Sequence, residues 1–145
     1  MFSFLLNFTY GVLAFFLVFL VESFFIKLGL PVPNRNFSAF TVGGLYIPAF
    51  LEELVKISFT FLAVYRLKNN FHLTLGIPIG FGFVESYFSP EKDTLQKIFL
   101  HTIFWGIGYL IAKNIKTNKK IQFAIWLIIS SIVHFGYNMV TIFNF

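Results

Sequence analysis

Long uninterrupted apolar runs restrict the fold of this chain more than any other feature. No charged residue precedes Glu22, and the later apolar stretches also occupy whole segments instead of one face of a helix. A membrane-spanning helix needs about 20 mostly apolar residues. With 145 residues, of which only 12% are charged, the chain has room for about five such helices. We therefore expect a single integral membrane domain, residues 1–145, with no separate soluble domain.

The expected fold class is all-α, a polytopic transmembrane helix bundle. The five expected spans lie at residues 4–28, 37–67, 72–88, 94–112 and 121–143. Pro48 interrupts the second span, because a proline removes a backbone hydrogen bond and clashes with the preceding turn. Two alternatives stay open: the helix is kinked near Pro48, or it is broken there and the span begins at Pro48. The third span is short and rich in glycine, which lets neighbouring helices approach closely.

The basic residues predict how the bundle is oriented in the cell membrane. Six flank the spans on the N-terminal side and four on the other side: Arg66, Lys68, Lys113, Lys116, Lys119 and Lys120 against Lys27, Arg35, Lys92 and Lys97. Cytoplasmic loops carry the excess of lysine and arginine, so the N-terminus is expected in the cytoplasm and the C-terminus outside. No basic face accompanies the aromatic residues, which argues against a nucleic-acid partner. The chain has no cysteine, which excludes thiolate chemistry and disulfides.

Seven polar residues lie inside the expected spans, where a charged side chain costs about 2.5–3.5 kcal/mol and usually marks function. They are Glu52, Glu53, Lys56, Glu85, His101, His134 and Asn138. Glu52 and Lys56 are four residues apart, so they share a helix face and are expected to pair. Glu53 lies about 100° further round the same helix. His134 and Asn138 share one face of the last span.

These groups lie at similar depths in four consecutive spans, which predicts one polar cavity in the outer half of the membrane. Each pair alone also fits a structural role, as a buried ion pair or an interhelical polar contact, but seven such groups favour a functional cavity. Glu22, with Lys27 five residues on, is expected to be structural. Trp105 and Trp126 are expected to serve as packing residues and interface anchors.

The order of these motifs resembles that of the PrsW family of intramembrane proteases. The matching segments are Glu52-Glu53-Leu54-Val55-Lys56, Phe81 to Glu85, His101, and His134 to Asn138. The family pattern is E-E-x-x-K, F-x-x-x-E, H and H-x-x-x-N/D on four successive helices, and the match covers about residues 48–138. The family is related to the type II CAAX prenyl endopeptidases and to the CPBP (Abi) proteins. The motif-bearing helices would then occupy about residues 48–143.

The resemblance implies an endopeptidase that hydrolyses a peptide bond of a membrane-anchored protein or peptide. By this resemblance, Glu52 or Glu53 activates the water molecule with help from His101, and His134 and Asn138 polarise the scissile carbonyl. Glu85 completes the polar group of the site, and Lys56 and Phe81 support it. The residue types agree with this chemistry independently. A glutamate beside a histidine can supply a general base and a general acid, and a histidine with an asparagine can supply oxyanion donors.

Two questions stay open at this point. Glu85, His101 and His134 have the ligand types of a two-histidine, one-carboxylate metal site. Because H-E-x-x-H spacing is absent, we favour a mechanism with no required cofactor, and a divalent metal such as zinc is the alternative. The rival function is a non-catalytic membrane protein, either a bacteriocin-immunity factor or a proton-coupled transporter, since intramembrane carboxylates and histidines also form proton relays.

Overall fold

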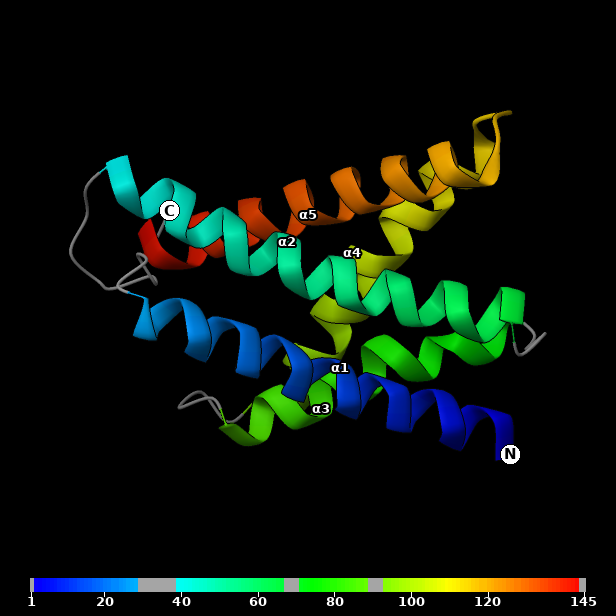
Figure 1. The fold of residues 1–145 in the computed structure, drawn as a ribbon, viewed down its shortest axis with the longest axis horizontal. Coiled ribbons are helices and arrows are strands. Elements are labelled where there is room, and N and C mark those ends of the chain that lie inside the picture. Colours follow the sequence, from blue (N-terminus) through cyan, green and yellow to red (C-terminus); the bar gives the residue numbers. More distant parts are fainter. Residues whose placement is uncertain (1, 29–38, 67–70, 89–92, 144–145) are drawn as a thin grey trace.

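The described residues form a bundle of helices with no strand (Figure 1). A computed structural model describes residues 2–28, 39–66, 71–88 and 93–143. The helices are α1 (Phe2–Lys27), α2 (Ala39–Phe61), α3 (Gly76–Phe88), α4 (Thr94–Asn114) and α5 (Lys119–Phe143). A π-helical turn, Leu62–Arg66, extends α2, and a 3₁₀ turn, Phe71–Leu75, leads into α3. The predicted all-α class is confirmed.

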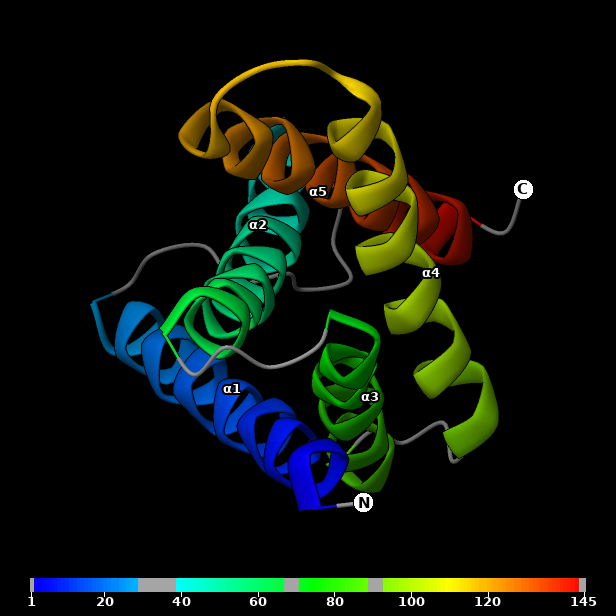
Figure 2. The same ribbon diagram turned by 90° about the vertical axis from the view of Figure 1, so that its right-hand side faces the viewer.

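The helices alternate in direction along the long axis of the bundle (Figure 1). The start of α1, the end of α2, the end of α4 and the start of α5 lie at one end of the molecule. Seen along the bundle, α1 and α3 form one side, α2 and α5 form the other, and α4 connects α3 with α5 (Figure 2). The chain therefore crosses the length of the bundle with each successive helix.

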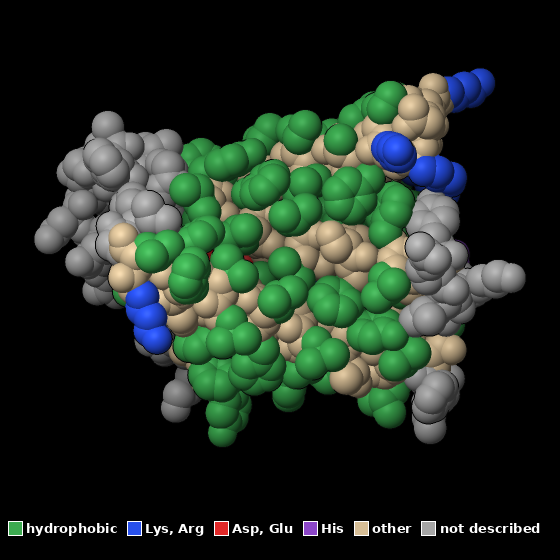
Figure 3. All heavy atoms as spheres, viewed as in Figure 1, with side chains coloured by type: hydrophobic (Ala, Val, Ile, Leu, Met, Phe, Trp, Pro, Cys, Tyr) green, Lys and Arg blue, Asp and Glu red, His purple; other side chains and the backbone are tan. Residues whose placement is uncertain are grey.

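Three helices are long and apolar enough to cross a membrane: Ser3–Lys27, Thr94–Asn114 and Lys119–Val140. On the face shown in Figure 3, hydrophobic side chains cover the middle of the molecule, and lysines and arginines lie only towards its two ends. These features indicate a membrane protein. The other two helices are weaker candidates, because α2 carries three charged residues and α3 has 13 residues, or about 20 Å of helix.

Of the two alternatives at Pro48, the break is excluded, because α2 is a continuous helix from Ala39 to Phe61 that contains this proline. A proline inside a membrane helix is tolerated where neighbouring helices support the altered turn, and α2 packs against α5 and α1. One consequence concerns depth. Glu52 lies 13 residues after Ala39, about 20 Å along the helix. It therefore lies further from the start of its helix than it would if the helix began at Pro48.

Glycines bring the backbones of α1 and α3 into direct contact. A Cβ atom added to Gly11 would lie 2.1 Å from the carbonyl oxygen of Ile77, and one added to Gly80 would lie 2.2 Å from that of Phe8. Only the absence of a side chain allows such an approach. The glycine-rich third segment thus packs closely against α1, as its composition predicted.

We expect Gly80→Ala to destabilise the protein by about 1–3 kcal/mol, because the added methyl group meets a backbone atom that cannot turn away. Gly106→Ala is the matched control, since a Cβ atom there meets nothing within 4 Å and alanine favours the helix by about 1 kcal/mol. Chemical unfolding of both variants in detergent would measure the difference. Equal stabilities would contradict the close contact between α1 and α3.

Trp105 and Trp126 pack in the interior of the bundle. They are 1% and 4% exposed, so their expected packing role is confirmed and the interface role is wrong. Trp126 Nε1 donates a hydrogen bond to the backbone oxygen of Trp105 (2.7 Å), and Trp105 Nε1 donates one to Thr60 Oγ1 (3.1 Å). The Thr60 hydroxyl donates to the backbone oxygen of Lys56 (2.9 Å). This chain of bonds joins α5, α4 and α2 directly beside the polar residues of α2.

Candidate functional site

Polar side chains from four helices meet in the interior of the bundle. We call this set the polar cluster. Its members are Glu52, Glu53 and Lys56 of α2, Glu85 of α3, Lys97 and His101 of α4, and His134 of α5. Side chains three or four residues apart share a helix face, which explains how α2 and α4 each present more than one group to the same place.

Lys56 is the centre of the polar cluster. Its side chain is fully buried, and its Nζ donates hydrogen bonds to Glu53 Oε1 (2.6 Å) and to His101 Nδ1 (2.8 Å). The same atom lies 4.8 Å from the centre of the Phe81 ring, a cation–π contact. A buried ammonium group is tolerated only when it is paired and hydrogen-bonded. The pairing differs from the expected one: Lys56 binds Glu53, three residues away, and not Glu52.

His101 lies between a lysine and a carboxylate. An ammonium group has only donors, so the ring accepts at Nδ1 from Lys56, and its proton lies on Nε2, which donates to Glu85 Oε2. Glu85 also accepts a hydrogen bond from Lys97 Nζ (2.9 Å). Phe81 packs against the His101 ring edge-on, with the ring centroids 4.9 Å apart. Both nitrogens of His101 are thus committed within the polar cluster.

His134 stands between the two glutamates of α2. Its Nδ1 lies 3.1 Å from Glu53 Oε1, and its Nε2 lies 3.8 Å from Glu52 Oε2. The ring stacks on Phe104, with centroids 4.6 Å apart and 22° between the planes. Since Nδ1 donates to Glu53, Nε2 carries the lone pair in the neutral ring. The lone pair therefore faces Glu52.

Glu52 is a carboxylate of the polar cluster with one oxygen that forms no hydrogen bond among the described residues. Its Oε2 is buried and accepts no hydrogen bond from any described residue. The two nearest histidine nitrogens, His134 Nε2 and His101 Nδ1, are 3.8 Å and 3.9 Å away. Such distances exceed a direct hydrogen bond, so this buried oxygen has two histidine nitrogens near it but no bond to either. Glu53 Oε2 is also unbonded among these residues, but Glu53 is fully buried.

A cavity of about 290 Å³ reaches the polar cluster from the side of the bundle. Its acidic lining comes from three helices: Glu22 of α1, Glu52 of α2 and Glu85 of α3. Apolar side chains of α1 and α3, such as Phe15 and Phe88, complete the wall. Acidic atoms are visible between α1 and α2 on the face of the molecule in Figure 3. Water and a polar ligand therefore have access to Glu52 but not directly to Glu53.

Glu22, expected to be structural, forms no ion pair with Lys27 among the described residues. Glu22 instead borders the acidic cavity. Lys97, counted from the sequence only as a residue flanking a span, also belongs to the polar cluster. The sequence carried one signal for this: Lys97 lies four residues before His101, which places both side chains on the same face of the helix. Asn138 lies on α5 one helical turn beyond His134, as its spacing predicted.

A metal site is the alternative reading of this geometry. The group within reach of one ion contains Glu52, His101 and His134, whose ligand atoms lie within 4.8 Å of one another. Glu52 thus takes the place expected for Glu85, which is bound to His101 Nε2. The fit is poor, because Lys56 Nζ already donates to the His101 nitrogen that faces Glu52. An ion there would displace a buried ammonium group or lie beside it.

The fold and the site define a helical membrane protein with a buried cluster of carboxylates, histidines and lysines. No protein-family model matches the chain, and no curated protein or solved structure is significantly similar to it.

Proposed function

We propose that this protein is an intramembrane endopeptidase that hydrolyses a peptide bond of a membrane-anchored protein or peptide with activated water. The observation that carries the proposal is the Glu52 carboxylate. One of its oxygens is buried, lacks a hydrogen-bond donor among the described residues and lies 3.8 Å from His134 Nε2, while the residue itself borders the acidic cavity. The motif order that resembles the PrsW family supports the same assignment.

In the proposed reaction, Glu52 acts as the general base. It takes a proton from a water molecule that enters through the acidic cavity, and the hydroxide attacks the scissile carbonyl carbon. Glu52 then passes this proton to His134 Nε2, which donates it to the leaving nitrogen as the C–N bond breaks. Asn138 is proposed as a donor to the oxyanion. No step of this reaction needs a metal ion.

The remaining members of the polar cluster act as positioning residues. Glu53 fixes His134 through Nδ1, and Glu85 fixes His101 through Nε2. Lys56 joins the two halves through its bonds to Glu53 and His101. These fixed rings and charges would hold the water and the substrate carbonyl in one geometry, which is a major source of rate enhancement. His101 therefore orients the site in this proposal instead of assisting the base directly.

Cleavage of a candidate single-span substrate by the purified wild-type protein in detergent, with and without a chelator, tests the proposal. Cleavage in both conditions would support the glutamate mechanism, and loss of cleavage with chelator would support a metal mechanism.

One observation favours a second candidate function, a proton relay. Hydrogen bonds connect the polar side chains in an unbroken series, which runs from Lys97 through Glu85, His101, Lys56 and Glu53 to His134. Proton flux into liposomes with no cleavage of any substrate would support that reading.

We further propose that all five helices cross the cell membrane, with the N-terminus in the cytoplasm. The excess of flanking lysine and arginine residues supports this orientation. A reporter fused at Asn118 should be cytoplasmic, and one fused after Phe145 should be outside. The reverse result would contradict the orientation and move the start of α1 and the junction of α4 with α5 to the outer face.

A further inference from the structure

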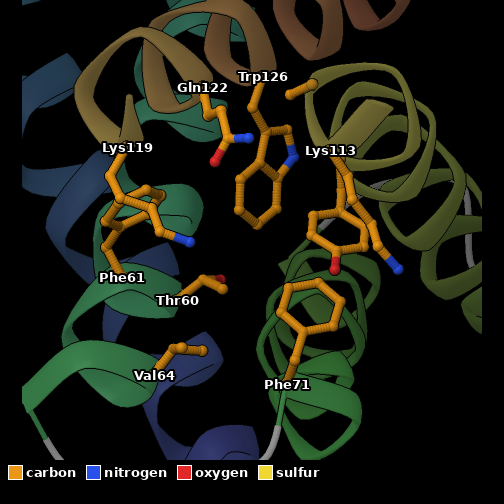
Figure 4. A pocket seen from close by; sticks show the side chains of 10 residues that line it. Thr60, Phe61, Val64, Phe71, Lys113, Lys119, Gln122 and Trp126 are labelled. Atoms are coloured by element: carbon orange, nitrogen blue, oxygen red, sulfur yellow. The ribbon is translucent and has the colours of Figure 1, made fainter. Parts of the chain in front are cut away.

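A second cavity, of about 460 Å³, lies at the opposite end of α2 from the expected outer face (Figure 4). Its volume is within the range of small-molecule sites, about 300–1,000 Å³. Thr60 and Trp126, both nearly fully buried, form part of its lining, and the side chains of Lys113 and Lys119 are exposed. Figure 4 shows these two lysines on opposite sides of the cavity. We call it the lysine pocket.

The walls of the lysine pocket are aromatic and well packed. Phe71 stacks on Tyr109 with centroids 3.8 Å apart, and Tyr109 lies 5.2 Å from the Trp126 ring. Lys113 Nζ lies 5.8 Å from the centre of the Tyr109 ring. These contacts come from the 3₁₀ turn, α4 and α5, so three segments hold the wall in place. A rigid apolar wall of this kind favours a hydrophobic ligand group.

The charge of the lysine pocket is entirely positive. Every lining residue belongs to residues 54–84 or 94–145, and neither segment contains an aspartate or a glutamate. The connection from Lys113 to Lys120 adds Lys116 to the same end of the bundle. A ligand that suits both the walls and the lysines therefore combines apolar groups with a negative charge.

We propose that the lysine pocket binds an anionic phospholipid, with its phosphate between Lys113 and Lys119 and apolar groups against the aromatic wall. The pocket lies where α4 ends and α5 begins, at one end of two helices that are apolar enough to cross a membrane. Basic pockets between such helices bind the headgroups of anionic lipids. The proposal concerns lipid binding alone and does not depend on the proposed peptidase activity.

Tryptophan fluorescence tests the proposal directly, because Trp126 lines the pocket and the chain contains only two tryptophans. The purified protein in detergent would be titrated with phosphatidylglycerol carrying brominated acyl chains, and with the matching phosphatidylcholine. We expect phosphatidylglycerol to quench at lower concentrations. The double variant Lys113→Gln/Lys119→Gln should lose about 30-fold in affinity for phosphatidylglycerol, because two lysine contacts with an anionic headgroup are removed.

The matched control is Lys116→Gln/Lys120→Gln, which removes the same charge from the same connection but from outside the lining. This control variant should keep the wild-type preference for phosphatidylglycerol over phosphatidylcholine. Equal losses in both double variants, or no preference for phosphatidylglycerol in the wild type, would overturn the proposal. Trp126→Phe should remove most of the quenching. Displacement of the lipid by millimolar inorganic phosphate would also overturn it, because the pocket would then be a site for free phosphate.

Discussion

The Glu52→Gln variant is expected to fold and insert like the wild type but to cleave substrate about 10²–10⁴ times more slowly. Glutamine keeps the size and the hydrogen-bonding groups of the side chain and removes the general base, whose contribution is of this order. Stability should change little, because Glu52 Oε2 accepts no hydrogen bond from the described residues. The cleavage rate and the unfolding transition in detergent would be measured on the same preparation.

Two further variants separate catalysis from structure at this site. Glu52→Asp keeps a carboxylate but shortens its reach, so its rate should fall between those of Glu52→Gln and the wild type. Glu53→Gln should lower stability as well as rate, because Glu53 holds both Lys56 and His134. Normal cleavage by Glu52→Gln would end the assignment of Glu52 as the base.

The Lys56→Met variant is expected to lose about 3–5 kcal/mol of stability, the usual cost of removing one partner of a buried ion pair. The loss arises because Glu53 then stays buried without its cation, and His101 loses its donor at Nδ1. Chemical unfolding in detergent would measure it. Methionine is apolar and of similar length, so the lost charge and not a lost volume would dominate the effect.

A double variant makes the Lys56 prediction specific. Lys56→Met/Glu53→Gln removes both charges, and replacement of a complete buried pair is often neutral. The double variant should therefore be more stable than Lys56→Met alone, and the two changes should be strongly non-additive. Additive losses would show that Lys56 and Glu53 do not act as a pair. The double variant Lys56→Met/Glu52→Gln is the control, and it should show no such recovery.

The existence and limits of the helices could be predicted largely from the apolar runs. Residues 4–28 and 121–143 were long enough to leave few alternatives, and α1 and α5 correspond closely to them. The sequence could not decide between a kink and a break at Pro48, for a physical reason. The proline ring fixes the local cost, which is a lost backbone hydrogen bond and a steric clash with the preceding turn. Whether the helix continues despite this cost depends on packing against α1 and α5, and a local sequence pattern does not reveal that packing.

The members of the polar cluster could be named from the sequence, but not all of their contacts. Spacing alone allowed Lys56 to pair with Glu52 or Glu53, since both separations place side chains on one face. The choice of Glu53 depends on His134, which comes from a helix 81 residues further along. The place of Glu22 beside Glu52 and Glu85 likewise depends on the packing of α1 against α3, and no local pattern joins these positions.

The direct backbone contact between α1 and α3 also determines which parts of the bundle can move. With glycine at Gly11 and Gly80, no flexible side chain lies between the two helices at these crossings, so sliding or tilting of one would drive backbone atoms together. We therefore expect α1 and α3 to shift as a single rigid body. Between α1 and α2 the contacts are made by side chains such as Tyr10 and Phe59, which can change rotamer. If the proposed peptidase activity holds, a substrate segment is expected to enter between α1 and α2, with α1 and α3 moving together.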